Sequence, residues 1–186
     1  MLSGRSERVD FVLSHMKRDG RAVVAVDGPC ASGKTTLVDD LSDKIPFTRI
    51  SMDDFFLPSE LRTPERFSKK GGNIHYERFI DEVIVPVREH RPFTYRRFSC
   101  RTLTYEGEVS VPEGGIIIVE GSYSLHPKFT PYWDVSFLLS VDSGEQIRRL
   151  ALRSPDKLEM FRTKWIPLEN EYFAGCDIAS RATYVL

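Results

Sequence analysis

The chain has 186 residues, which is enough for one domain of ordinary size. Its 26 Lys and Arg residues nearly balance its 27 Asp and Glu residues, so the formal net charge is −1. A balanced charge gives no overall attraction to nucleic acid or to an acidic membrane, and we expect neither as a partner. With 12 Gly and 11 Pro residues, the composition also excludes a collagen-like or low-complexity chain.

The apolar segments are too short to cross a membrane. No apolar run exceeds five residues, and runs such as Ile116–Val119 have the length of a buried strand, whereas a transmembrane helix needs about 18 apolar residues. The N-terminus lacks the apolar stretch of a secretory signal. The three cysteines offer neither a disulfide framework nor a paired metal motif: Cys30, Cys100 and Cys176. We therefore expect a protein of the reduced cytoplasm.

Helix-like and strand-like patterns alternate along the chain. The first helical pattern contains Val9, Val12, Leu13 and Met16 and is expected to end at Asp19–Gly20. Apolar runs predict strands over Ala22–Val26, Phe47–Met52, Ile116–Val119, Val135–Val141 and Ala182–Val185. Helical spacing predicts helices over Thr35–Lys44, Tyr76–Glu89, Glu145–Leu152 and Leu168–Phe173. This alternation predicts a doubly wound α/β domain with a mostly parallel sheet.

One segment departs from that alternation. Phe93–Val109 has the pattern of an exposed β-hairpin rather than of a core strand. The sequence shows no internal repeat and no linker, so residues 1–186 are predicted to form a single domain.

The segment Gly28–Thr36 carries the clearest chemical signal. It follows the first predicted strand and matches the pattern G-x-x-x-x-G-K-[ST] at every fixed position. Glycines let successive backbone N–H groups face one anion, and the loop leads into a helix N-terminus that also favours phosphate. Lys34 can reach the terminal phosphates, and the Thr35 hydroxyl can bind Mg²⁺. The residues expected to bind the nucleotide are Gly28, Pro29, Cys30, Ala31, Ser32, Gly33, Lys34, Thr35 and Thr36.

A glycine-rich turn would explain part of this pattern, but the full match favours a nucleoside triphosphate site. Three classes of protein share such a loop: guanine-nucleotide switches, motor or assembly ATPases, and small-molecule kinases. The Asn-Lys-x-Asp motif that reads guanine does not occur in the sequence, and the chain is short for a motor ATPase. We therefore favour a small-molecule kinase that uses ATP and Mg²⁺.

Two predicted strands end in carboxylates. Asp53 and Asp54 follow the second strand, and Glu120 follows the third. Since ligands of an open parallel sheet bind at the carboxyl ends of the strands, a strand adjacent to the first would bring Asp53 or Asp54 beside the γ-phosphate. A carboxylate there could deprotonate an attacking hydroxyl or hold Mg²⁺ through water, and Glu120 could hold a Mg²⁺-bound water. The alternatives are a turn or helix cap for the aspartates and a surface position for Glu120.

Two basic stretches could complete the site. The predicted hairpin, about residues 91–109, contains Tyr95, Arg96 and Arg97, which would contact the acceptor or form a charged surface. A second stretch leads into a predicted lid over about residues 153–165. Its arginines could contact the triphosphate or lie on a solvated helix face: Arg149, Arg153 and Arg162.

Four segments together resemble the uridine kinase and phosphoribulokinase group of P-loop kinases. They are Gly28–Thr36, Ser51–Phe56, Asn73–Phe79 and Val119–Gly121. The resemblance implies a three-layer P-loop nucleoside triphosphate hydrolase fold and ATP-dependent phosphorylation of a hydroxyl, often on a nucleoside such as uridine. It also implies that Asp53 is the general base and that Glu120 is the metal-associated acid.

The sequence departs from that family at one position. Cys100 stands about where uridine kinases have a histidine that contacts the base. An arginine-rich pocket also suits a sugar phosphate or a carboxylate, because guanidinium groups match those anions. We therefore keep two alternatives, a kinase for an anionic metabolite and a nucleotide-binding regulator without transfer activity. A small-molecule partner is expected, and a homo-oligomer is compatible with the sequence.

Overall fold

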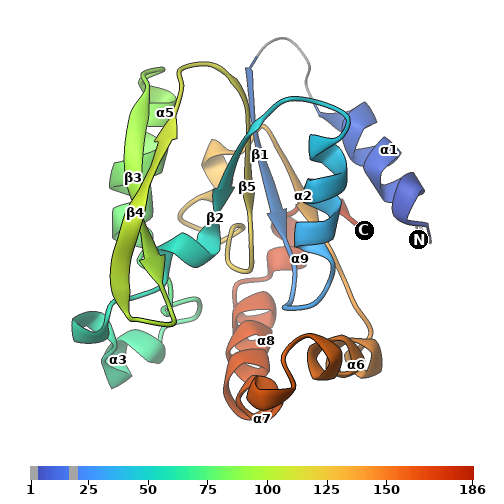
Figure 1. Ribbon diagram of the computed structural model, residues 1–186, viewed down its shortest axis with the longest axis vertical. Coiled ribbons are helices and arrows are strands. Elements are labelled where there is room, and N and C mark those ends of the chain that lie inside the picture. Colours follow the sequence, from blue (N-terminus) through green and yellow to red (C-terminus); the bar gives the residue numbers. More distant parts are fainter. Residues whose placement is uncertain (1–3, 17–20) are drawn as a thin grey trace.

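A parallel sheet of five strands runs through the centre of the fold. The computed structural model describes residues 4–16 and 21–186. The strands of the sheet are β1 (Arg21–Asp27), β2 (Thr48–Ser51), β5 (Gly115–Glu120), β6 (Val135–Leu138) and β7 (Tyr184–Val185). They lie side by side in the order β2-β5-β1-β6-β7 (Figure 1). The predicted α/β class with a mostly parallel sheet is confirmed.

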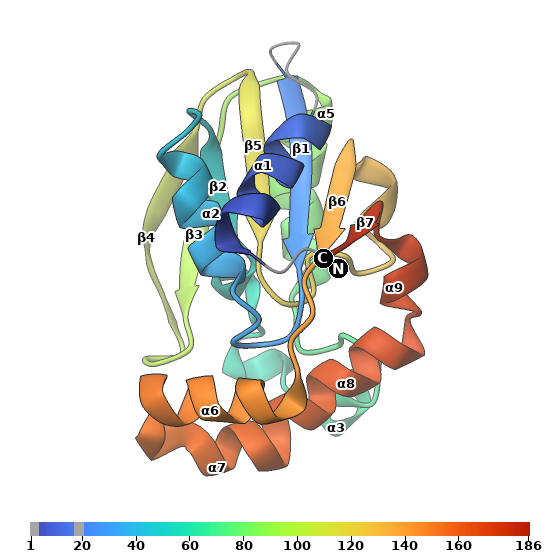
Figure 2. The same cartoon turned by 90° about the vertical axis from the view of Figure 1, so that its right-hand side faces the viewer.

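Helices and helical turns cover both faces of the sheet, which makes the fold three-layered (Figures 1 and 2). On one face, α1 (Arg5–His15) and α2 (Lys34–Ser42) bury their apolar sides against the strands. Alternate residues of β1 serve the two faces: Val26 packs beneath these helices, and Ala25 belongs to the opposite core. The opposite core is rich in aromatic rings, among them Phe55, Phe79, Tyr95, Tyr123, Phe129 and Tyr172.

The position of β5 corrects one expectation. β5, not β2, pairs with β1, and β2 pairs with the far side of β5. Glu120 therefore stands on the strand adjacent to the phosphate loop, in register with Val26 on one side and Ser51 on the other. Asp53 reaches the same edge from one strand further away.

Element boundaries differ from the predictions where local hydrogen bonds intervene. The predicted end of the first helix at Asp19–Gly20 lies outside the described residues. β6 ends at Leu138 rather than at residue 141, because the Asp142 side chain accepts hydrogen bonds from two backbone N–H groups and starts the next helix. The last strand holds two residues, which pair with Phe137 and Leu138.

The predicted helix Tyr76–Glu89 is helical throughout but uneven. It consists of α4 (Tyr76–Phe79), a wider π-type turn (Ile80–Ile84) and α5 (Val85–Arg88). Pro86 explains the widening, since proline has no N–H to donate to the preceding turn and its ring crowds that turn's carbonyl.

The next segment forms the predicted hairpin, which stands apart from the main sheet (Figure 1). Its strands β3 (Phe93–Ser99) and β4 (Thr104–Val111) pair in the antiparallel sense. Along β3, Tyr95 is buried whereas Arg96 and Arg97 are exposed, so one face of the hairpin joins the aromatic core.

A group of helices lies beyond the carboxyl ends of the strands (Figure 2). It includes α6 (Ser143–Arg153), a turn at Pro155–Lys157, α7 (Leu158–Met160), a turn at Phe161–Trp165, α8 (Ile166–Gly175) and α9 (Ile178–Arg181). Four further short segments are the turns Met52–Phe55, Ser59–Leu61 and Thr130–Tyr132 and the helix α3 (Pro64–Phe67). Within the described ranges, no helix has the length and apolar character needed to cross a membrane.

Phe79 provides a test of how the core supports the carboxyl edge. Its buried ring packs against Phe55, at a centroid distance of 4.9 Å, and against Phe129, at 4.6 Å. Phe55 belongs to the turn that carries Asp53. We expect Phe79→Ala to lower the free energy of unfolding by about 3–5 kcal/mol, measured by urea denaturation. The control is Leu152→Ala at an exposed position, where we expect a loss within about 0.5 kcal/mol; an equally small loss for Phe79→Ala would contradict the assignment of the core.

Candidate functional site

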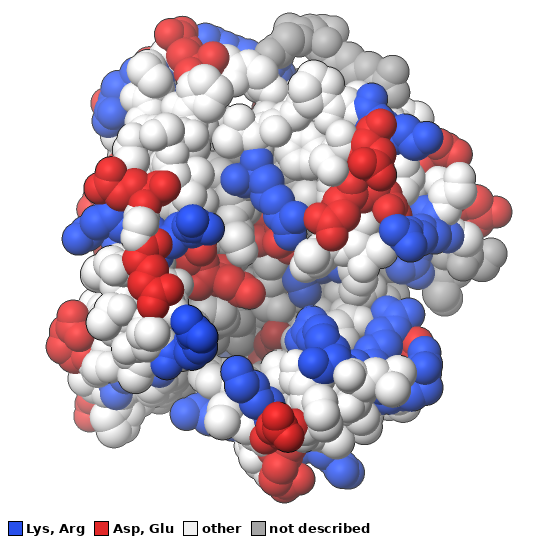
Figure 3. Space-filling model, in the orientation of Figure 1, with Lys and Arg blue, Asp and Glu red and all other residues white. Residues whose placement is uncertain are grey.

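A cavity of about 1290 Å³ opens at the carboxyl edge of the sheet. In Figure 3 it is the hollow between the hairpin and the helices below the sheet, with basic side chains along its border. The phosphate loop, Asp53 and Glu120 line one cavity together with parts of the α6–α8 region. The structure thus brings most of the predicted nucleotide and catalytic residues to one place.

Two glycines shape the phosphate loop. Gly28 has φ 149°, and a Cβ there would lie 2.5 Å from the Leu139 carbonyl oxygen, which excludes any side chain. Gly33 has φ 100° and ends the loop at the start of α2. The glycine positions of the motif are therefore required by backbone conformation and, at Gly28, also by close packing.

The loop offers open donors to an anion. In the described part of the chain, no acceptor is bonded to the backbone N–H groups of Ala31, Gly33, Lys34, Thr35 and Thr36. The Ser32 hydroxyl is also buried without a partner. Unpaired donors at a buried loop and helix N-terminus fit the phosphates of a nucleotide, which would satisfy them.

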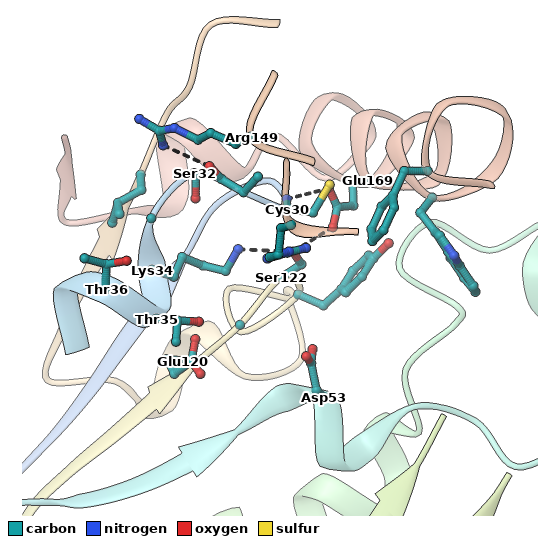
Figure 4. Close-up of a pocket in the computed structure, with 18 of the residues that line it drawn as sticks. Cys30, Ser32, Lys34, Thr35, Thr36, Asp53, Glu120, Ser122, Arg149 and Glu169 are labelled. Atoms are coloured by element: carbon teal, nitrogen blue, oxygen red, sulfur yellow. Dashed lines mark hydrogen bonds between the residues drawn. The ribbon is translucent and has the colours of Figure 1, made fainter. Parts of the chain in front are cut away.

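Lys34 is held inside the loop by three oxygen atoms. Its Nζ donates to the carbonyls of Gly28, at 2.7 Å, and Pro29, at 2.9 Å, and to the Ser122 hydroxyl at 3.4 Å. The ammonium group is buried and points toward the cavity beside Ser122 (Figure 4). A positive charge stored at this position stabilises phosphate oxygens at the loop.

Asp27, the last residue of β1, anchors the start of the loop. Its buried carboxylate accepts hydrogen bonds from the N–H groups of Gly28 (2.6 Å), Tyr123 (3.1 Å) and Leu125 (2.8 Å), and from the Tyr172 hydroxyl (2.7 Å). Burial raises the pKa of Asp27 to about 6, although these donors and Lys34 favour the charged form. The carboxylate joins the loop, the segment after β5 and α8.

Glu169 makes a second link from α8 to the loop. Its carboxylate accepts from the Cys30 N–H and from the Ser122 hydroxyl, each at 2.8 Å (Figure 4). Gln146 of α6 donates to the Cys30 carbonyl at 2.9 Å. Burial and then the charge of Glu169 raise the pKa of the Cys30 thiol to about 12, so this cysteine stays protonated and plays a structural part in the loop.

Asp53 and Glu120 face the cavity from two strands (Figure 4). The Asp53 side chain is exposed to the cavity, and protein atoms surround the cavity at this point. The resulting loss of solvation, followed by the charge of Glu120, raises the pKa of Asp53 to about 6. Glu120 is buried and accepts from the Arg49 guanidinium at 2.6 Å. Lys34 lies close enough to oppose the rise in the pKa of Asp53.

The donor atoms here fit Mg²⁺. The Thr35 hydroxyl and the Glu120 and Asp53 carboxylates all offer hard oxygen ligands. Among the residues that the structure describes, no group of three or more His, Cys, Asp or Glu side chains forms a metal site by itself. Phosphate oxygens and water would have to complete the coordination, as is usual for Mg²⁺ at a nucleotide.

The predicted acceptor residues of the hairpin do not line the cavity. The Tyr95 hydroxyl donates to the Asp54 carboxylate at 3.0 Å, and neither residue lines the cavity. Arg96 pairs with Glu82 at 3.5 Å and stacks on an aromatic ring of the hairpin. Arg97 is exposed on the same strand.

Of the three arginines assigned to the predicted lid region, two line the cavity and one does not. Arg149 lines the cavity and donates to the Ala31 carbonyl of the loop at 2.9 Å. Arg153 also lines the cavity, next to the Phe161 ring. Arg162 is exposed and lies outside the cavity lining.

Comparison with solved structures gives the fold. A possible uridine kinase from Bacillus stearothermophilus aligns with a TM-score of 0.74 and 21% identity over 97% of this chain and 98% of its own. A candidate fructose transport system kinase from Silicibacter sp. TM1040 aligns with a TM-score of 0.67 and 23% identity over 100% of both chains. No family model and no curated protein matches the sequence. This chain has the P-loop kinase fold.

Several residues of this P-loop kinase fold escaped prediction from the sequence. Asp27 directly precedes the loop motif, and its place at a strand end was a usable signal. Ser122 and Glu169 reach the loop through tertiary contacts that no local pattern reveals. Arg62 also lines the cavity without a sequence signal, whereas Asn73 and Arg101 lie in segments that the sequence had marked but were not assigned to the site.

The role of Asp27 can be tested by removing first one of its donors and then one of its acceptor oxygens. Tyr172→Phe deletes one donor to the carboxylate, and we expect a loss of roughly 1–2 kcal/mol of unfolding free energy. Asp27→Asn turns an acceptor oxygen into a donor that faces other donors, so we expect roughly 3–5 kcal/mol and weaker nucleotide binding. Urea unfolding and titration with a fluorescent ATP analogue measure these losses. Wild-type stability of Asp27→Asn would contradict the four-donor arrangement.

Proposed function

We propose that this protein transfers the γ-phosphoryl group of ATP to a hydroxyl group of a small molecule. One observation carries the proposal. A phosphate loop with open N–H donors and a buried lysine shares its cavity with the carboxylate of Asp53. Glu120 is available as the metal-associated carboxylate, so a site that only bound Mg·ATP would not need a second carboxylate facing the loop.

The residues divide the chemistry between them. The loop N–H groups and Lys34 bind and orient the phosphates, and Arg149 and Arg153 extend this positive surface from the lid side. Thr35 and Glu120 would hold Mg²⁺, which neutralises phosphate charge when bound. Asp53 accepts the proton of the acceptor hydroxyl while that oxygen bonds to phosphorus and the bond to ADP breaks. Its raised pKa makes it a better base than an aspartate of ordinary pKa.

The acceptor space has aromatic walls. Phe56 lies between Tyr123 and Trp165, each at a ring distance of 6.4 Å, and all three line the cavity. Flat apolar walls beside a base support a ring-bearing acceptor such as a nucleoside, the class that the family resemblance suggests. The three free cysteines support the expectation of a reduced compartment.

Two adjacent aspartates allow a matched test of the proposed base. We expect Asp53→Asn to lower kcat by about 10²–10⁴-fold and to retain ATP binding, because it removes the proton acceptor but not the phosphate loop. Asp54→Asn should cost about tenfold or less, because Tyr95 already engages that carboxylate away from the cavity. Coupled ADP release and calorimetric titration with ATP measure the two effects. Equal losses in both variants would contradict the assignment.

The same assay separates a kinase from a regulator. A panel of nucleosides, sugars, sugar phosphates and hydroxy acids should contain acceptors that stimulate ADP release. If the wild-type protein binds ATP and Mg²⁺ but no acceptor stimulates ADP release, the protein is a nucleotide-binding regulator and the proposed function is wrong.

A further inference from the structure

The lining of the cavity includes a set of basic residues from outside the phosphate loop, here called the basic cluster. It consists of Arg62, from the segment before α3, Arg101, from the tip of the hairpin, and Lys157, from the lid. Figure 3 shows basic side chains from these parts of the fold on both sides of the hollow. The cluster comes from three separate segments of the chain, so it exists only in the folded protein.

The basic cluster borders the space beside the proposed base. Arg62, Arg101 and Lys157 line the same cavity as the carboxylate of Asp53. An acceptor in this cavity can therefore meet both the base and the cations.

These cations lack acidic partners. Arg62 is held by the Leu57 carbonyl at 2.7 Å, which fixes its guanidinium without neutralising it. Over the described ranges, Arg101 makes no hydrogen bond or ion pair, and the Lys157 ammonium makes none either. Many arginines elsewhere in the fold pair with carboxylates, as Arg66 does with Glu77 at 2.7 Å.

A buried amide adds a second unsatisfied group to the same cavity. Asn73 is 4% exposed, lines the cavity, and its Nδ2 has no hydrogen-bond partner of normal geometry in the described chain. A buried donor without a partner costs free energy unless a ligand supplies the acceptor. The cluster and this amide thus all present donors, and none of them presents a negative charge.

We infer that the acceptor carries an anionic group, a phosphate or a carboxylate, which Arg62, Arg101 and Lys157 bind while the acceptor hydroxyl lies at Asp53. This inference rests on the proposed function and narrows its acceptor class. Guanidinium groups suit both anions, because their N–H donors match two oxygens of a phosphate or a carboxylate. The basic cluster therefore favours acceptors with a negative charge, and the aromatic walls contact the rest of the acceptor.

For binding an anionic acceptor, the structure points to other arginines than the sequence did. Arg96 faces Glu82 outside the cavity, so the anion site does not depend on the Arg96–Arg97 pair singled out by the sequence. Arg101, four residues later on the same hairpin, has the free guanidinium instead.

The experiment compares related acceptors with and without an anionic group. The pairs are ribose 5-phosphate and ribose, glycerate and glycerol, and uridine 5′-monophosphate and uridine. We expect the anionic member of at least one pair to react with the higher kcat/KM; the first and third pairs report a phosphate and the second a carboxylate. Arg101→Gln and Arg62→Gln should then lower that kcat/KM by about 10–100-fold, mainly through KM, with little change for the neutral member.

Two matched variants control for structural damage. Arg21→Gln removes an exposed arginine, paired with Glu113 at the opposite end of β1, and should leave every rate unchanged. Arg101→Lys keeps the charge and should restore part of the loss. Higher KM for ATP in Arg101→Gln with unchanged acceptor KM would assign Arg101 to the triphosphate and overturn the inference.

Binding without turnover separates this inference from the proposed function. Calorimetry with the same pairs, in the presence of Mg²⁺ and a non-hydrolysable ATP analogue, should show tighter binding of an anionic member that Arg101→Gln abolishes. If such binding is found but no phosphoryl transfer occurs, the inference on the anion site stands and the proposed function falls. If neutral members bind or react as well as anionic ones in every pair, the inference is wrong and the proposed function remains.

Discussion

The phosphate loop depends on one buried carboxylate. Asp27 receives the N–H of Gly28 at the start of the loop, two N–H groups of the segment after β5, and the hydroxyl of Tyr172 on α8. A carboxylate this deep is tolerated because four donors surround it and Lys34 lies nearby. Through one side chain, the loop, the strand that carries Glu120 and the lid-side helix are held in a common frame.

A second carboxylate of α8 extends this frame. Glu169 reaches the Cys30 N–H and Ser122, and Ser122 in turn contacts Lys34. The Ser122 hydroxyl links the negative charge of Glu169 to the positive charge of Lys34. These contacts stabilise the buried ammonium group without a phosphate present. The near-neutral composition of the chain thus conceals a strongly charged interior at the carboxyl edge of the sheet.

The sequence predicted what local chemistry determines. The loop motif, the apolar strands and the hairpin alternation follow from residue type and spacing, and the structure has them in those places. It could not predict that β5 separates β1 from β2, because strand order depends on long-range packing. Nor could it distinguish Arg96 from Arg101, which differ only in whether a carboxylate lies within reach in the folded chain.

The hydrogen bond between Tyr95 and Asp54 decides more than the packing of the hairpin. Asp53 and Asp54 are adjacent on the turn Met52–Phe55 that follows β2, and the hairpin engages Asp54. Asp53, which lacks this hydrogen bond, is the carboxylate that lines the cavity. Deletion of one residue between β2 and Asp53 would bring Asp54 to the place of Asp53 and Phe55 to the place of Asp54, so the length of this short turn determines which carboxylate faces the cavity.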